Sequence, residues 1–250
     1  MKQFLQRIFF WLLLVFTIFL IFRPWFTTKV ICRGDCVYFF TDNLKSFFDV
    51  PLFWNTSPVG SGLGYFALPT LTFSPPHFLL GFFYQLFGFN YEILEKIIFY
   101  IPFLFFSCLG MLYLAQVLGL SRVGRFFATI FYIANTYILL VVDGGQVGIA
   151  LAYSLVPIVF AFFIKGLGNQ EQKSKILSGL LMGFLMLFDL RVAYLLFGLI
   201  FLYVLFNILG KEFKRTIPNT IQSLVLVLII PLGLHFFWIV PLFWTRTAAI

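Results

Sequence analysis

Residues 97–118 read IIFYIPFLFFSCLGMLYLAQVL, an apolar stretch without a single charged side chain. A helix needs roughly 20 mostly apolar residues to cross the hydrocarbon core of a bilayer. This stretch therefore predicts a transmembrane helix, and it indicates that much of the chain is surrounded by lipid.

Comparable apolar stretches occur on both sides of residues 97–118. They cover residues 4–22, 126–142, 147–164, 176–188, 192–209 and 221–240, of which 176–188 is the shortest. The composition agrees, because 62% of the 250 residues are hydrophobic and 10% are charged, with a mean hydropathy of +1.02. A soluble domain has about half apolar and about a quarter charged residues. The sequence predicts an all-α, polytopic transmembrane bundle of about seven spans, forming a single domain over residues 1–250.

The charged residues predict how these helices are oriented. Lys and Arg collect on cytoplasmic loops, which accounts for the net charge of +8 without a nucleic-acid partner. If residues 4–22 are an uncleaved anchor with a cytoplasmic N-terminus, the cytoplasmic loops carry Arg122, Arg125, Lys165, Lys173, Lys175, Lys211, Lys214 and Arg215. The Asp residues then all lie outside: Asp35, Asp42, Asp49, Asp143 and Asp189. The pattern predicts a multi-pass protein of the cell membrane.

Residues 23–91 form a long outer loop between the first two predicted spans. Loops of this length are usually functional. Within the loop, residues 77–89 (HFLLGFFYQLFGF) are apolar but too short to cross the bilayer. We expect them to form an interfacial helix that lies along the membrane surface.

Asp35 and Asp42 are the candidate functional carboxylates of this loop. A carboxylate at a membrane surface can act as a general base or hold a divalent cation. Capping a helix or a turn is the alternative role, and it is the commoner one for Asp in loops. Cys32 and Cys36 also lie here and could close a small disulfide loop outside the cytoplasm.

Arg191 is the candidate ligand for a phosphate group. The tripeptide Asp189-Leu190-Arg191 interrupts an apolar stretch near the predicted outer surface. Arg191 could form an ion pair with Asp189 at a hairpin tip, or it could bind a lipid phosphate through its forked donors. The sequence contains no phosphate-binding glycine loop, nucleophile elbow or Cys/His cluster, so a cytosolic nucleotide site is not supported.

The order of several short motifs resembles that of the bacterial lipoteichoic-acid-glycosylating membrane proteins. It also resembles the N-terminal membrane domain of mycobacterial arabinofuranosyltransferases; both are GT-C glycosyltransferases. The motifs are DNL at 42–44, PLFWN at 51–55, SPPHFLL at 74–80, LGMLYLA at 109–115, LSR at 120–122, IFYIANTY at 130–137, GGQ at 144–146 and AYSLVP at 152–157. Members of these families continue through more helices, so the chain is expected to be the N-terminal part of a larger protein.

The resemblance implies transfer of a sugar from a polyprenyl-phosphate donor to a cell-envelope glycan or lipid outside the cytoplasm. Asp42 matches the place of the catalytic carboxylate of that class, and Asp35 is a second catalytic candidate. Arg191, Trp54 and Asn55 are then candidates for substrate binding, and a divalent cation is a possible cofactor. Two alternatives stay open: a lipid or polysaccharide transporter without chemistry, and a structural subunit.

Overall fold

The computed structural model describes residues 2–31, 33–34, 44, 78–168, 170–208, 217–236 and 239–240. All regular secondary structure in these ranges is helical, which confirms the predicted all-α class. Six helices are long and apolar enough to cross a membrane: Phe4–Trp25, Tyr91–Val117, Arg122–Asp143, Val147–Gly168, Leu190–Asn207 and Ile217–Leu234. These helices support the prediction of a multi-pass membrane protein.

Several of the six apolar helices consist of more than one labelled element. The first combines α1 (Lys2–Phe22) with the short 3-10 turn η1 (Arg23–Trp25), and the second joins α4 (Tyr91–Glu95), the π-helical turn η3 (Lys96–Tyr100) and α5 (Ile101–Val117). The third combines α6 (Arg122–Ile133) and α7 (Thr136–Asp143). The remaining helices are α8 (Val147–Gly168), α9 (Gln172–Met186), α10 (Leu190–Ile208) and α11 (Ile217–Leu234).

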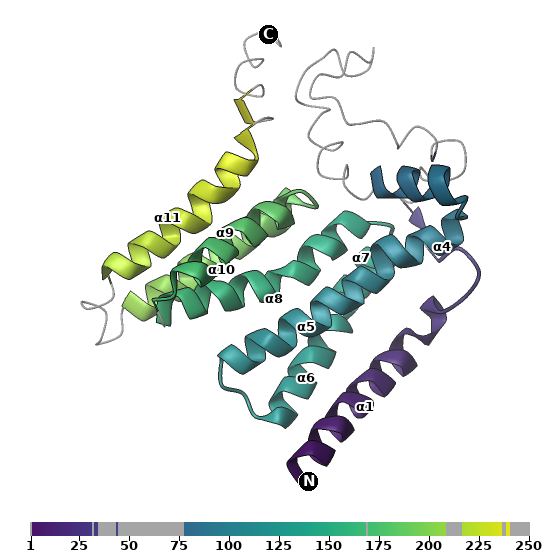
Figure 1. Cartoon of the computed structure of the whole chain (residues 1–250), viewed down its shortest axis with the longest axis horizontal. Coiled ribbons are helices and arrows are strands. Elements are labelled where there is room, and N and C mark those ends of the chain that lie inside the picture. Colours follow the sequence, from purple (N-terminus) through teal and green to yellow (C-terminus); the bar gives the residue numbers. More distant parts are fainter. Residues whose placement is uncertain are drawn as a thin grey trace.

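Figure 1 shows α11, α9, α8, α5 and α1 following one another across the bundle, with α6 beside α5. The central helix is α8, because 67% of its most apolar window is buried, against 6% for α1. Gly110 on α5 lets α5 and α8 approach closely, since a Cβ there would lie 3.4 Å from the backbone nitrogen of Ile158. The core of the bundle therefore forms around α8, and α1 lies at its edge.

The seventh predicted span, residues 176–188, is not confirmed. The corresponding helix α9 begins earlier, at Gln172, and ends at Met186 after 15 residues. Such a helix rises about 22 Å, which is less than the roughly 30 Å of a hydrocarbon core. Its buried face nevertheless packs against both α8 and α11.

A short apolar helix covers Phe78–Phe87 within the predicted interfacial segment 77–89, while its placement along the membrane surface stays a prediction. It rises only about 15 Å and lies at one end of the bundle, beside α4 (Figure 1). Gly88, with a φ of +64°, ends it, and its amide donates to the carbonyl of Tyr84 at 3.0 Å. Residues 78–87 are thus a separate helix and not a continuation of the span that begins at Tyr91.

A break divides the third apolar helix between α6 and α7. Asn135 caps α7 by accepting the amide of Ile138 at 3.0 Å, and its Nδ2 donates to the carbonyl of Tyr132 at 2.8 Å. The rings of Tyr132 and Tyr153 stack at 4.3 Å, and each hydroxyl donates to the backbone carbonyl of the other residue. These bonds satisfy polar backbone groups at membrane depth, where water cannot.

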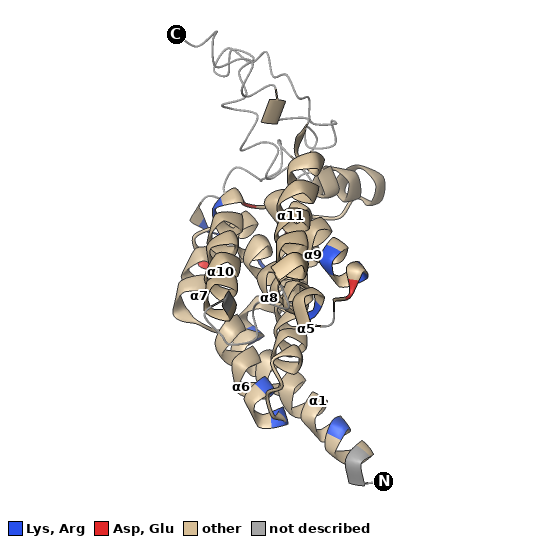
Figure 2. Cartoon of the chain, turned by 90° about the vertical axis from the view of Figure 1, so that its left-hand side faces the viewer, with Lys and Arg blue, Asp and Glu red and all other residues tan. Residues whose placement is uncertain are grey.

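The helices alternate in direction, so the described charges fall at two ends of the bundle. We call the end where α1, α6, α9 and α11 begin the basic end; its cations are Arg7, Arg122, Arg125, Lys165, Lys173 and Lys175. Figure 2 shows Lys and Arg at the beginnings of α1 and α6. The Nη1 of Arg122 donates to the Oε1 of Gln6 at 3.2 Å, which ties α6 to α1 there. Asp143 and Asp189 lie at the other end, which we call the opposite end, together with the cations Lys29, Lys96 and Arg191.

Lys175 differs from the other cations of the basic end because it is buried, with 3% of its surface exposed. Its Nζ donates to Asn219 and, at 2.6 Å, to the Oε1 of Gln222. Asn219 in turn donates to the carbonyl of Leu167 at 2.7 Å. Burial lowers the pKa of the Lys175 ammonium group. This residue therefore fastens α9 to α11 and to the end of α8, instead of lying free in a loop.

Candidate functional site

Of the predicted site residues, the structure describes only Arg191. Asp35, Asp42, Trp54 and Asn55 lie outside the described residues, as do Cys32 and Cys36. The site is therefore built from the described groups at the opposite end of the bundle, where the outer loop begins.

Asp189 and Arg191 form an ion pair at the start of α10. The Nη2 of Arg191 lies 2.7 Å from the Oδ2 of Asp189, and its Nε lies 3.1 Å from the same oxygen. Asp189 also accepts the amides of Arg191 and Val192, at 2.8 and 3.1 Å, so it caps α10. The Asp189 side chain is buried, whereas 67% of the Arg191 side chain is exposed. The carboxylate thus holds a guanidinium group that still faces outward.

An apolar cavity of about 280 Å³ also lies at the opposite end of the bundle. Four segments line it: the helix Phe78–Phe87, the η3–α5 segment, α8 and the end of α9. Phe188 is part of the wall, and Asp189 is the next residue. Ser154, the polar side chain of an otherwise apolar wall, donates its hydroxyl to the carbonyl of Leu151 at 2.6 Å. The cavity is therefore suited to hydrocarbon.

Glu95 is a buried carboxylate that the spacing of the sequence motifs does not single out. It has no exposed surface, and its Oε1 accepts the amide of Ile31 at 2.7 Å and the Nζ of Lys96 at 3.1 Å. Lys96 also donates to the carbonyls of Lys29 and Glu92, at 2.8 and 2.6 Å. These bonds fasten the chain after α1 to the start of the second apolar helix. A π-helical turn follows at once, and such turns are frequent at functional sites.

The chain continues from Ile31 toward the turn between α7 and α8. Gly34 adopts a φ of +60°, and a Cβ there would lie 2.4 Å from the carbonyl oxygen of Gly144. Only glycine allows both this backbone conformation and this approach. The beginning of the outer loop is therefore held against two helix ends that are far apart in the sequence.

The sequence does contain a signal for Glu95 and Lys96. They are an ionisable pair at the edge of a long apolar stretch, and ionisable groups at such places are costly and commonly functional. Their pairing with residues 29–31 cannot be read from spacing, because those residues lie on the far side of the long outer loop. Within the described ranges, no group of three or more His, Cys, Asp or Glu side chains could hold a metal ion.

The helices and their two differently charged ends define the class of this chain as a multi-pass helical membrane protein. Comparison with known proteins adds no narrower family. No protein-family model matches the chain, and no curated protein or solved structure matches it significantly.

Proposed function

We propose that the protein is a membrane glycosyltransferase that moves a sugar from a polyprenyl-phosphate donor to an acceptor outside the cytoplasm. The observation that carries the proposal is that the opposite end of the bundle holds both a hydrocarbon-lined cavity and an outward-facing guanidinium, that of Arg191, three residues after the cavity residue Phe188. A polyprenyl phosphate has the same two parts, an apolar chain and an anionic head. The order of motifs that resembles GT-C enzymes gives the second support.

In this proposal the opposite end of the bundle faces outward, and the donor enters from the outer leaflet. The prenyl chain occupies the cavity beside Phe188, and the exposed guanidinium of Arg191 binds the phosphate. Asp42 removes the proton from an acceptor hydroxyl, and that oxygen attacks the anomeric carbon of the sugar. The bond between this carbon and the phosphate oxygen breaks, and polyprenyl phosphate leaves with the electron pair.

Asp35, Trp54 and Asn55 are proposed to complete the site from the outer loop. Asp35 is the second carboxylate; if a divalent cation takes part, Asp35 and Asp42 are the residues that would hold it, and it would neutralise charge on the leaving phosphate. Trp54 and Asn55 would contact the sugar, since an aromatic face and an amide suit the two sides of a pyranose or furanose ring.

The test measures release of polyprenyl phosphate, the product common to every donor of this kind. The purified full chain in liposomes is given a panel of polyprenyl-phosphate sugars together with envelope glycan and glycolipid acceptors. We expect release from at least one donor, reduced roughly 10²–10⁴-fold by Asp42→Asn, because this change removes the base and keeps the size of the side chain. Asp49→Asn, outside the matched motif, is the control and should leave the rate unchanged. Equal rates for wild type and Asp42→Asn would refute the catalytic role.

One observation favours a lipid or polysaccharide transporter instead. The break between α6 and α7 is a discontinuous helix of the kind that transporters use at their binding sites. Here, however, Tyr132, Tyr153 and Asn135 fill the break with hydrogen bonds to the backbone and to one another. The same liposomes distinguish the two functions, since a transporter would move labelled donor from the outer to the inner leaflet without releasing polyprenyl phosphate.

A further inference from the structure

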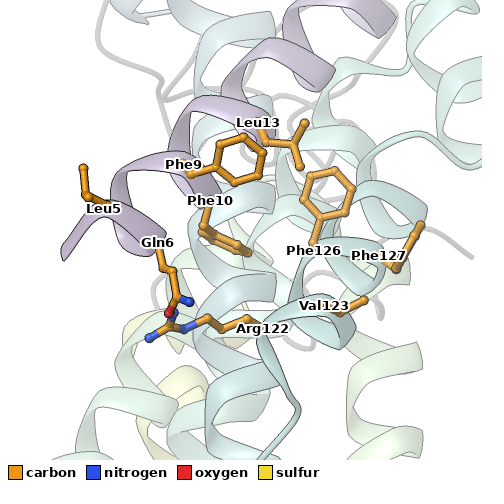
Figure 3. Close-up of a pocket in the computed structure, with 9 residues that line it drawn as sticks. All are labelled: Leu5, Gln6, Phe9, Phe10, Leu13, Arg122, Val123, Phe126 and Phe127. Carbon is orange, nitrogen blue, oxygen red and sulfur yellow. The ribbon is translucent and has the colours of Figure 1, made fainter. Parts of the chain in front are cut away.

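An open groove of about 800 Å³ separates the first half of α1 from α6, at the basic end of the bundle. Its walls are apolar, and four phenylalanine rings supply much of them: Phe9, Phe10, Phe126 and Phe127. Figure 3 shows these rings on one side of Gln6 and Arg122, whose side chains meet at the end of the groove. The volume lies within the range of about 300–1,000 Å³ that is usual for sites of small ligands.

The groove opens sideways, so hydrocarbon is the material available to fill it. Phe9 and Phe127 are exposed, whereas Leu14, the residue after Leu13 of the groove wall, is fully buried. α1 therefore packs against the bundle at Leu14 and meets α6 again at the basic end through Gln6 and Arg122, which leaves the groove between these contacts. An acyl chain gains little by leaving other acyl chains for such a groove, because both surroundings are apolar. Any preference for one lipid must come from its head group.

The charges at the end of the groove favour an anionic head group. The Arg122 guanidinium is exposed, and its hydrogen bond to Gln6 uses one of its five donors. Arg7 follows Gln6 in the chain, and Arg125 lies one turn beyond Arg122. Within the described part of the chain, none of these three arginines forms an ion pair with an acid. The sequence accounts for this, since residues 1–34 and 96–142 contain neither Asp nor Glu.

We infer that this groove binds one anionic phospholipid from the leaflet that surrounds the basic end. One of its two acyl chains lies between α1 and α6, and its phosphate accepts hydrogen bonds from Arg122, which Gln6 holds in place. Arg7 and Arg125 add attraction for a net negative head group, as clustered basic residues do at an anionic membrane surface. This site is separate from the cavity beside Phe188, and it does not depend on the proposed transferase activity.

The test is native mass spectrometry of the purified full chain in a mild detergent. The chain is titrated with dioleoyl phosphatidylglycerol and with dioleoyl phosphatidylcholine, which share the same tails. We expect one phosphatidylglycerol to remain bound after gas-phase activation that strips phosphatidylcholine. Arg122→Gln should weaken phosphatidylglycerol binding about tenfold, which corresponds to about 1.4 kcal/mol, because it removes charged hydrogen-bond donors from the phosphate.

Two further variants distinguish the contribution of the head group to binding from that of the acyl tail and from that of the general positive charge at this end. Lys173→Gln removes one exposed cation from the same end, outside the groove, and should leave the affinity unchanged. Leu13→Trp fills the groove and should weaken binding of both lipids. Equal retention of the two lipids, or equal phosphatidylglycerol affinity of wild type and Arg122→Gln, would overturn the inference. A lipid-free dimer that forms in place of the lipid complex would overturn it too, and would assign the groove to a second copy of the chain.

Discussion

Arg191 shows how one side chain can serve both the fold and the proposed chemistry. Asp189 caps α10 and orients the guanidinium, so the ion pair expected for a hairpin tip is present. The exposed side of the guanidinium is what remains for a ligand. The sequence leaves pairing and phosphate binding as alternatives, and the geometry is compatible with both at once.

The first residue-scale prediction concerns this guanidinium. Arg191→Gln leaves the Asp189 cap in place but removes the charge, so we expect the KM for the lipid-phosphate donor to rise about tenfold while kcat changes little. Steady-state release of polyprenyl phosphate at varied donor concentration measures both constants. Thermal unfolding provides the control, since a change in KM that comes with a large loss of stability would indicate a structural role only.

Gly34 gives the second residue-scale prediction. Gly34→Ala should destabilise the protein through a left-handed backbone and through contact with the carbonyl of Gly144. Gly88→Ala is the matched control, because Gly88 has a similar φ of +64° and nothing within 4 Å of the added Cβ. Thermal unfolding in detergent should show a clearly larger loss for Gly34→Ala. Equal losses would mean that residues 29–34 do not pack against the turn between α7 and α8.

The limits of sequence reasoning at this scale are physical. The charge pattern places Lys175 in a cytoplasmic loop, yet this residue is buried and bonded to Asn219 and Gln222. Glu95 and Lys96 stand out in the sequence only as an ionisable pair at the edge of an apolar stretch, and nothing there shows that Glu95 joins two segments of the fold. Charge alone does not reveal such partners, because they come from other helices whose rotation the sequence does not specify.

Among the elements, α9 depends most on close packing. Gly179 and Gly183 stand four residues apart on its face toward α11. A Cβ at Gly179 would lie 2.7 Å from the carbonyl oxygen of Leu226, and one at Gly183 would lie 2.6 Å from the Cδ1 of Leu234. Small residues at this spacing let helices approach closely in membranes. They compensate for the shortness of α9, whose stability then rests on its neighbours.

The element-scale prediction follows from that contact. Gly179→Ala should lower the unfolding temperature, because the backbone of α11 cannot move away as a flexible side chain could. Gly198→Ala on α10 is the matched control, with nothing within 4 Å of its added Cβ. There alanine should raise stability by roughly 0.5–1 kcal/mol, the usual gain over glycine in a helix. Unfolding followed by circular dichroism measures both variants, and the same sign of change for both would contradict the packing.

Apolar length alone is sufficient to locate most of the helices. Residues 97–118 and 147–164 are predominantly apolar stretches without a charged residue, and at this length such stretches are typical of helices that cross a bilayer. The break between α6 and α7 does not follow from the sequence, since Asn135 interrupts the apolar pattern no more than other polar residues do. What ends α6 there is the cap and the stacked tyrosines, which require α8 to be in place.

Across the whole molecule, the alternating helices place Asp143 and Asp189 at the opposite end and most of the described cations at the basic end. The separation expected from the loops is partial, since Lys29, Lys96 and Arg191 lie at the opposite end, the last two in ion pairs with acids. The candidate site could be predicted less well, because four of its residues belong to the outer loop and its described partners, Glu95 and the cavity wall, arise only from packing.

The proposed function requires the opposite end to face outward, and membrane topology tests this most directly. Each reporter cysteine is introduced after Cys32, Cys36 and Cys108 are replaced by serine. Thr28 at the opposite end and Gln172 at the basic end are both exposed, so a cysteine at either position can react with a maleimide. Ser174, also at the basic end, is buried and would react poorly. In intact cells, a membrane-impermeant maleimide should label Thr28→Cys at once and Gln172→Cys only after lysis. The reverse pattern would place Asp42, Arg191 and the outer loop in the cytoplasm and contradict the proposed function.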